Sequence, residues 1–480
     1  YALGVTLMGN RNPRLGVWVG LAAALFMAFG YWHMAIGRVS LRIILTPLVT
    51  ALLLTFLIRG MRSQSRTDWV LAGLTLGIGL YTYQAVRMLP LVVIAAAALA
   101  FVTYARTFAQ RRTLLMNFIA LVMVAFVVFV PMFRFSVEYP NDFWRRSAGR
   151  LFGDDLITET LADGTMVERS PTIQERMNAF GENVPILGQN LLNVVLMFNY
   201  RGDIIYLHNA AMFPAFSPWM GALFIAGVVA WLIRLIRQRD AAEALLLLSL
   251  LIMLLPSALS IANPTENPSH TRTSGAMPAA YLLAGFGLVW LTVTLRAALA
   301  ARWRTAALVG ALSVSGVLFW NTDTALIRNE YRANYIAAWK PLSDGGKLLR
   351  GFAESGGAYG NAFMLAYEHW WDYRIVAVEA GLTPGRWTNG DIALEQLPQR
   401  IAEAINLPET DIGHLYPDRD LLFIYSDEDT QTAEQLAAWF PEGRESRLAT
   451  YKEDVFIRTY RVPAMGNALG RWLIENGGMQ

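Results

Sequence analysis

The sequence predicts a polytopic α-helical membrane protein of about nine transmembrane helices with a C-terminal α/β domain in water. Only 16% of its 480 residues are charged, whereas 55% are hydrophobic, and an ordinary soluble domain carries about 25% charged residues. Charge is also divided unevenly, with 25 basic and 14 acidic residues in 1–320 against 15 and 23 in 321–480. We therefore expect a basic transmembrane domain over 1–320 and an acidic soluble domain over 321–480.

Two features of the composition bear on the class of protein. The chain has no cysteine, which excludes disulfides, thiolate zinc sites, iron–sulfur clusters and a cysteine nucleophile. It begins with Tyr1 rather than methionine, and 1–8 are already apolar. No signal peptide is visible, because there is no basic segment followed by a short apolar run and a cleavage site. We interpret this opening as the end of a membrane helix, and expect the chain to lack its true N-terminus.

The predicted spans are uncharged runs near the ~20 residues needed to cross a hydrocarbon core. They cover 15–34, 43–58, 69–86, 88–105, 113–133, 218–233, 244–262, 277–295 and 305–320. Each is predicted to be helical, because a backbone in lipid must satisfy its own hydrogen bonds. The apolar stretch 186–198 holds three amide side chains and is interpreted as an interfacial or re-entrant helix, with a tenth span as the alternative.

The distribution of arginine predicts which side each loop faces. One set of alternate loops holds 14 arginines and the other set, counting short loops, holds four. Positive residues accumulate on the cytoplasmic side, so the first set is expected there. With an odd number of spans, the long loop 134–217 and the domain 321–480 then lie outside. We expect a multi-pass protein of a bacterial inner (plasma) membrane with an extracytoplasmic C-terminal domain.

The soluble part, 321–480, is predicted to be a small α/β domain. Strand-like runs cover 362–368, 421–425 and 455–462, and 432–440 has helical spacing. This region shows neither a glycine-rich phosphate loop nor the ligand spacing of a zinc site. Its sequence therefore predicts a fold and gives no catalytic motif.

Polar side chains gather near the predicted outer ends of the spans. Those chosen as candidates for binding or catalysis are Tyr83, Gln84, Arg87, Arg134, Glu138, Arg145, Arg146, Glu266, His270 and Arg272. A guanidinium fork can hold phosphate oxygens bidentately, and a neighbouring carboxylate can act as a base or bind a cation. These residue types together favour a site for a lipid phosphate that carries a polar group.

Structural roles compete with each of these assignments. Arginine at a span end is more often an interface anchor than a ligand, and we regard Arg87 as the exception because it follows a polar helix end. Arg145 and Arg146 could lie on lipid head groups, and 263–272 could be a plain connection. The histidines are not spaced as metal ligands, so no metal site is predicted. Asp154 and Asp155 are interpreted as a solvated turn.

The layout and the motifs at 81–87, 143–147 and 263–272 resemble bacterial C-type glycosyltransferases of the protein mannosyltransferase-like and aminoarabinose transferase-like group. This resemblance implies inverting transfer of a sugar from a polyprenyl-phosphate donor to an acceptor protein, lipid or glycan at the extracytoplasmic face. It also implies that an acidic residue of the first outer loop is the base and that basic residues hold the leaving phosphate. A nucleic-acid partner is not expected.

One departure from that family pattern concerns the catalytic carboxylate. No acidic residue precedes Asp68, which is predicted to be cytoplasmic, so the expected base lies upstream of Tyr1 and the catalytic residue is unknown. Glu138 and Glu266 remain candidates for a second acid, and Arg87, Arg134 and Arg272 for phosphate holders. No cofactor is predicted, and a divalent cation is the alternative left open. An inactive fragment is also left open.

Two other classes of function compete with the glycosyltransferase. The missing carboxylate favours a non-catalytic membrane scaffold or complex subunit whose outer domain binds a partner. A transporter is weaker, because no ionisable side chain falls in the middle of any predicted span, where a coupled ion pathway would normally place one.

Overall fold

The chain forms two compact units in a computed structural model, Tyr1–Ala338 and Trp339–Gln480. The structure describes residues 1–9, 12–39, 41–153, 157–160, 166–169, 171–205, 209–295, 300–367, 371–383, 385–452 and 454–477. Asp154 and Asp155 of the predicted turn, and Glu368 of the first predicted strand, lie outside this set. The two units are described separately below.

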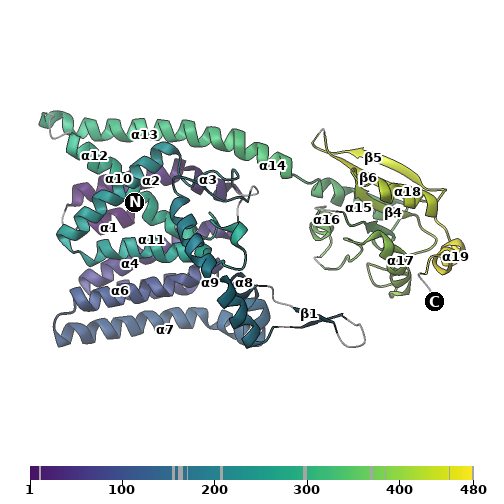
Figure 1. Cartoon of the computed structure of the whole chain (residues 1–480), viewed down its shortest axis with the longest axis horizontal. Coiled ribbons are helices and arrows are strands. Elements are labelled where there is room, and N and C mark those ends of the chain that lie inside the picture. Colours follow the sequence, from purple (N-terminus) through teal and green to yellow (C-terminus); the bar gives the residue numbers. More distant parts are fainter. Residues whose placement is uncertain are drawn as a thin grey trace. The chain divides into compact units, whose positions relative to one another are not determined.

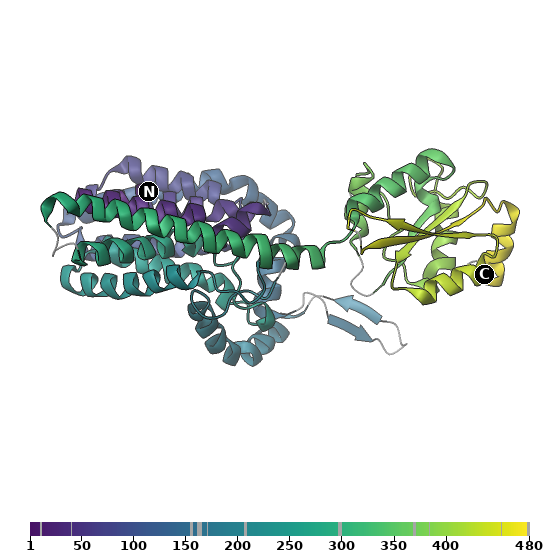
Figure 2. The ribbon, with the colours of Figure 1, turned by 90° about the horizontal axis from the view of Figure 1, so that it is seen from above.

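The first unit is a bundle of long helices that run side by side (Figures 1 and 2). Its helices are α1 (Ala2–Met8), α2 (Pro13–Phe29), α3 (Tyr31–Arg38), α4 (Leu45–Ser63), α5 (Arg66–Gly79), α6 (Leu89–Thr103), α7 (Phe108–Glu138), α8 (Pro140–Phe152), α9 (Ile173–Leu196), α10 (Pro218–Gln238), α11 (Ala241–Ala258), α12 (Met277–Leu295), α13 (Arg304–Leu326) and α14 (Arg332–Ala338). A two-stranded hairpin, β1 (Ile157–Thr160) and β2 (Met166–Arg169), follows α8.

Seven helices of the described chain are long and apolar enough to cross a membrane, or eight if α2 and α3 form one span. This confirms a polytopic membrane protein, with fewer full-length spans than the nine predicted. The predicted span 69–86 is the difference, because α5 ends at Gly79 after 14 residues, about 21 Å of helix. The span predicted over 15–34 is bent by 49° where α2 gives way to α3, at an extended Gly30.

Small residues let the helices of this unit approach closely. A Cβ on Gly4 of α1 would lie 2.8 Å from the Cα of Gly20 in α2. A Cβ on Gly285 of α12 would lie 2.8 Å from the backbone nitrogen of Ala23, also in α2. Between apolar helices in lipid, such contacts replace the hydrophobic drive that water supplies to soluble proteins. α2 therefore packs between α1 and α12 through its small side chains.

The sequence places the boundary between the two domains at 320, whereas the two compact units of the structure meet further along the chain. Helix α13 runs past Trp320 to Leu326 and continues through a π-helical turn, Ile327–Tyr331, into α14. Helical hydrogen bonding does not depend on hydropathy, so the rise of polar residues after Trp320 does not end the helix. The first compact unit consequently extends to Ala338.

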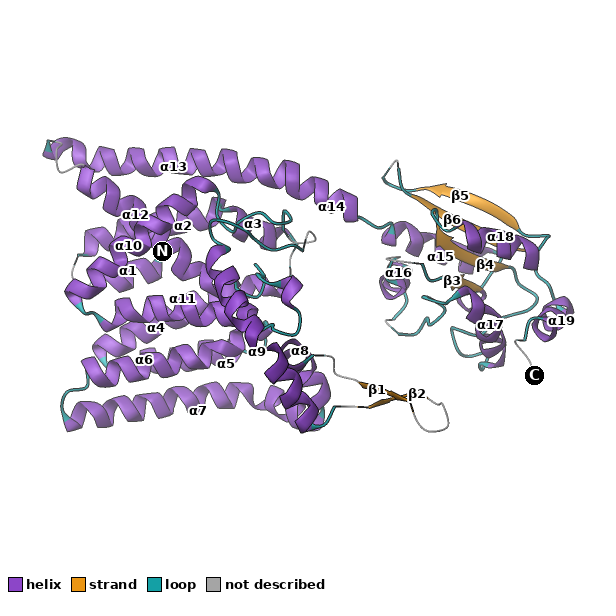
Figure 3. Ribbon diagram, viewed as in Figure 1, coloured by secondary structure: helices purple, strands orange, loops and turns teal. Residues whose placement is uncertain are grey.

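The second unit is an α/β domain around a four-stranded sheet, which confirms the predicted class (Figure 3). The strands β3 (Ala362–Met364), β4 (Leu421–Ser426), β5 (Arg444–Ala449) and β6 (Phe456–Val462) take the order β3-β4-β6-β5. β3 and β4 are parallel, the other pairs antiparallel, and Phe423 stands opposite Tyr460. The helices are α15 (Leu342–Ser355), α16 (Tyr373–Glu379), α17 (Leu397–Asn406), α18 (Thr430–Trp439) and α19 (Asn467–Glu475).

Each face of this sheet has its own apolar core. Phe423 packs with Leu436 of α18 and Leu473 of α19 on one face, whereas Ile424 packs with Leu349 of α15 and Val376 of α16 on the other. β4 is buried at all six positions, as expected for a central strand covered on both sides. The edge strand β5 was not predicted, because its exposed, charged sequence lacks the alternation of a half-buried strand.

Candidate functional site

A hollow of about 390 Å³ opens at the end of the first unit where α5 is followed by a turn and a short 3₁₀ helix, Gln84–Met88. It is lined by Arg42, Leu80, Tyr81, Thr82, Tyr83, Gln84, Arg87, Met132, Phe135, Asp142, Phe143 and Arg145. We call it the arginine hollow. It unites four residues predicted separately from two distant segments, Tyr83, Gln84, Arg87 and Arg145. Arg42 and Asp142 were not among the predicted site residues.

Local backbone structure places Tyr83, Gln84 and Arg87 at the hollow. Helix α5 ends at Gly79, and the chain then turns and passes through the 3₁₀ helix into α6. Pro90 lies in the first turn of α6, where no hydrogen bond requires the N–H that proline lacks. The hydroxyl of Tyr81 donates to the backbone oxygen of Val128 in α7 at 2.7 Å. This anchor fixes the turn against α7 and leaves the side chains that follow at the rim.

Arg87 is a half-buried cation that the described residues hold without a carboxylate. Its guanidinium donates to the Ser147 hydroxyl at 2.9 Å and to the Phe143 backbone oxygen at 3.3 Å. It also lies over the ring of Phe143, 4.1 Å from the centroid, and 5.5 Å from that of Trp144. Aromatic faces attract a cation without neutralising it. The positive charge of Arg87 is therefore not neutralised by these partners and can attract an anion in the hollow.

A second hollow of about 620 Å³ lies along α8. Its lining is Pro140, Asn141, Asp142, Trp144, Arg145, Ser147, Ala148, Leu151, Phe152 and Arg176. We call it the α8 hollow. Asp142 and Arg145 line both hollows, and Asp142 is the acidic side chain among the described residues of each lining. The amphipathic helix α8 thus brings one carboxylate and one cation to the place where two cavities meet.

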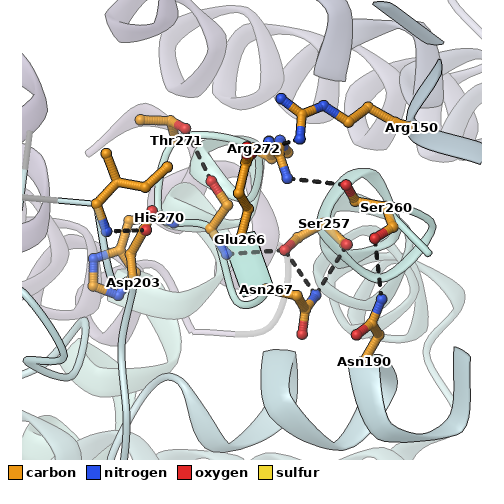
Figure 4. A network of polar contacts seen from close by, with 12 residues as sticks. Arg150, Asn190, Asp203, Ser257, Ser260, Glu266, Asn267, His270, Thr271 and Arg272 are labelled. Atoms are coloured by element: carbon orange, nitrogen blue, oxygen red, sulfur yellow. Dashed lines mark hydrogen bonds and ion pairs between the residues drawn. The ribbon is translucent and has the colours of Figure 1, made fainter. Parts of the chain in front are cut away.

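Glu266 and Arg272, both predicted site residues, are bonded to each other (Figure 4). Arg150 of α8 also pairs with the Glu266 carboxylate at 2.6 Å, and Arg272 donates to the Ser260 hydroxyl at 3.1 Å. Burial opposes ionisation of Glu266, but the two guanidiniums outweigh it and lower its pKa below the usual value. A carboxylate with a lowered pKa is a poor base. The positive charge of Arg272 is already neutralised by Glu266.

His270, another predicted ligand of the substrate, lies in a buried polar network. Its backbone N–H donates to the Asp203 carboxylate at 2.9 Å, and its Nδ1 lies 3.0 Å from the Asn209 side-chain oxygen. The Tyr31 hydroxyl bonds the same oxygen, and the Trp32 indole donates to the His270 carbonyl at 2.9 Å. These contacts join α3 to two loops, as Figure 4 shows for Asp203 and His270, so we assign His270 a positioning role.

Arg134 and Glu138, two further predicted residues, line neither hollow. Arg134 and Glu138 pair with each other at 2.7 Å, one turn apart on an exposed stretch of α7, with side chains 76% and 44% exposed. The side chain of Arg146 lies outside the described part of the structure. Among the described residues no group of three or more histidines and acids could hold a metal ion.

Comparison with known proteins finds solved structures that are similar to this chain. No protein-family model and no curated protein matches the chain. The chain is similar in fold to ArnT from Cupriavidus metallidurans, solved with undecaprenyl phosphate, at 13% identity and a TM-score of 0.48 over 96% of this chain and 81% of that one. It is also similar to the oligosaccharyltransferase AglB from Archaeoglobus fulgidus, solved with an inhibitory peptide and a dolichol-phosphate.

AglB aligns at 12% identity with a TM-score of 0.45, over 92% of this chain and 60% of its own. An oligosaccharyltransferase of Archaeoglobus fulgidus solved with zinc and sulfate gives 13% identity and 0.38, over 93% and 58%. The chain thus spans less than two thirds of the length of either archaeal structure.

Proposed function

We propose that this chain belongs to a membrane glycosyltransferase that moves a sugar from a polyprenyl-phosphate donor to an acceptor at the extracytoplasmic face. The observation that carries the proposal is Arg87, a cation held by neutral groups and aromatic rings in a hollow at the end of a membrane helix bundle. A membrane-embedded lipid with a phosphate head group fits that position, because its charge reaches the bundle end while its chain stays in lipid.

The donor phosphate is assigned to the arginine hollow. Arg87 binds phosphate oxygens through its guanidinium fork, and Arg42 and Arg145 add positive charge to the lining. Tyr83 and Gln84 supply hydroxyl and amide donors. Such fixed donors favour a phosphate that gains charge as it leaves. In the transfer, the bond between the sugar C1 and the phosphate oxygen breaks, and the acceptor oxygen bonds to C1.

The acceptor is assigned to the α8 hollow, with Asp142 as the carboxylate that takes the proton of its hydroxyl. Asp142 supports this role because it lines both hollows, whereas Glu138 and Glu266 are each paired with arginine. A protein, lipid or glycan acceptor must present a hydroxyl to C1 from the side opposite the phosphate for inversion. The arginine count supports the outer face, because the short loops at this end of the spans hold four arginines and those at the other end hold 14.

Binding of undecaprenyl phosphate to the purified chain tests the donor site directly. Native mass spectrometry in detergent should show binding that Arg87→Gln weakens by about 10- to 100-fold, the value of one charge-assisted hydrogen-bond pair. Arg134→Gln removes the same charge from an exposed pair on α7 and is the matched control. Equal affinity of Arg87→Gln and the wild type would overturn the site.

Turnover separates catalysis from mere binding. With a labelled sugar on a polyprenyl phosphate and membranes as acceptor source, Asp142→Asn should abolish label transfer while lipid binding persists. Label transfer by Asp142→Asn at the wild-type rate would refute the base assignment. If the wild-type chain does not bind the lipid, the non-catalytic scaffold replaces the glycosyltransferase as the proposed function.

A further inference from the structure

A further cavity, with a cationic rim, lies at the end of the spans opposite the arginine hollow. It measures about 480 Å³ and is lined by Ala97 and Phe101 of α6 and by Phe108, Arg111, Arg112, Leu114, Leu115 and Phe118 of α7. We call it the α6–α7 groove. The two helices lie next to each other and are joined by a short loop at this end, as Figure 1 shows. None of these residues lines the arginine hollow or the α8 hollow.

The walls of the α6–α7 groove are apolar and open to the surroundings of the helices. Phe108 is 85% exposed and Leu115 57% exposed, while Leu114 is buried. Both α6 and α7 belong to segments able to cross a membrane, so an open apolar groove between them is filled by hydrocarbon. From Phe108 to Phe118 the groove follows α7 for about 15 Å, a length that suits the upper part of an acyl chain.

Two adjacent arginines stand at the mouth of the groove. The Arg111 guanidinium lies 4.7 Å from the centroid of the Phe101 ring, and its Nε donates to the Ala105 backbone oxygen at 3.2 Å. Arg112 is exposed. Among the described residues neither guanidinium forms an ion pair. Acids do neutralise other arginines of this end, for example Arg62 by Asp240 and Arg234 by Glu243.

An apolar groove of acyl-chain length with two unneutralised cations at its mouth matches one kind of molecule in a membrane. We propose that the α6–α7 groove binds an anionic phospholipid, with an acyl chain between Ala97, Phe101 and Leu115 and the phosphate on Arg111 and Arg112. Basic pockets between membrane helices recognise anionic head groups in this way. A zwitterionic lipid would carry its own cation to the same two guanidiniums and is disfavoured.

Native mass spectrometry with dioleoyl phosphatidylglycerol and dioleoyl phosphatidylcholine tests the head-group half of the proposal. The wild-type chain should retain phosphatidylglycerol preferentially, and Arg111→Gln with Arg112→Gln should weaken this binding by about fivefold for each arginine. Arg14→Gln with Arg66→Gln is the matched control, because both are exposed arginines at starts of helices and lie outside the groove. Equal retention of the two lipids would overturn the proposal.

A second pair of variants tests the acyl-chain half with every charge intact. Ala97→Phe fills the groove and should reduce phosphatidylglycerol binding at least fivefold. Ala98→Phe places the same ring one position along α6 on an exposed site outside the lining and should leave binding unchanged. Cross-links from a phosphatidylglycerol with a photoreactive acyl chain should fall in 97–118, and cross-links confined elsewhere would refute the site.

This inference does not depend on the glycosyltransferase proposal. Undecaprenyl phosphate binding that Arg87→Gln abolishes and Arg111→Gln leaves intact would support the donor site whatever the result at the groove. Conversely, loss of phosphatidylglycerol binding in the groove variants with normal undecaprenyl phosphate binding would establish the groove as a separate lipid site.

Discussion

Arg62 and Arg87 occupy opposite ends of the helical unit, and the protein surrounds them differently. The Arg62 side chain is 10% exposed, pairs with Asp240 at 3.2 Å and donates to the backbone oxygens of Thr6 and Leu7. Asp240 also accepts from the Tyr104 hydroxyl at 3.1 Å. Arg87 instead meets one hydroxyl, one carbonyl and two aromatic rings. A neutralised cation joins helices, whereas an unneutralised one can bind an anion.

The Arg150–Glu266–Arg272 cluster lies between these extremes. It stands at the same end of the unit as Arg87, but its guanidiniums share one carboxylate. Two cations beside one anion leave an excess of positive charge, so the cluster can add to the attraction of a phosphate from a distance. Direct binding would require Glu266 to give up a partner. We therefore place this cluster with the structural pairs and Arg87 with the binding groups.

Arg62→Met carries the largest expected loss of stability. It removes the guanidinium from the largely buried Asp240 carboxylate, and removal of one partner of a buried pair costs about 3–5 kcal/mol. Thermal unfolding in one fixed detergent should show a clear fall in the midpoint. Arg87→Met is the matched control and should shift the midpoint much less. A larger fall for Arg87→Met would invert the comparison.

Glu266→Gln tests the intermediate cluster and its dependence on pH. At pH 7 the loss of the shared carboxylate should cost about 1–3 kcal/mol, since hydrogen bonds to charged groups are lost. In the wild type the folded pKa of Glu266 is lowered. Its stabilisation is therefore fully present above the unfolded pKa near 4.3 and declines as pH falls through the folded pKa.

The measurement is the unfolding midpoint of wild type and Glu266→Gln from pH 7 to pH 3. The difference between them should be constant down to about pH 4.3 and shrink below it, because protonated Glu266 resembles glutamine. A difference that grew as pH fell would contradict the sign of this linkage. Glu138→Gln, which lies in an exposed pair, is the control.

Arg134→Gln should have the smallest effect. The pair it breaks is exposed on both sides, and exposed i, i+4 pairs contribute about 0.3–0.5 kcal/mol. The unfolding midpoint should stay within error of the wild type at 150 mM salt. A shift as large as that of Glu266→Gln would show that the exposed stretch of α7 contacts something outside the isolated chain.

Segments whose own residues dictate their structure could be predicted. The spans were located because uncharged runs of sufficient length must form helices in lipid, and β4 was located because its apolar residues form a short continuous run. The shortness of α5 was missed, since 80–86 carries no charge that would end a predicted span, and the turn depends on the Tyr81 hydroxyl bonding the Val128 backbone oxygen. The exposed strand β5 carried no local signal.

The candidate site divides in the same way. Tyr83, Gln84 and Arg87 could be chosen from sequence because polar residues at the end of an apolar run are conspicuous. That Asp142 and Arg145 join them was not foreseeable, because α8 is placed by packing and not by its own residues. The assignments of Glu266 and Arg272 also needed the fold, since only the distance between them shows that they neutralise each other.

The sequence alone determined that this chain is a helical membrane protein with an α/β domain, because hydropathy and periodicity act along the chain. Tertiary structure decided which charges are paired. His270 meets Asp203 across 67 residues and Tyr31 meets Asn209 across 178, and no local pattern records such partners. Whether an arginine binds, anchors or stabilises depends on the groups within a few ångströms of it, and folding brings those groups together.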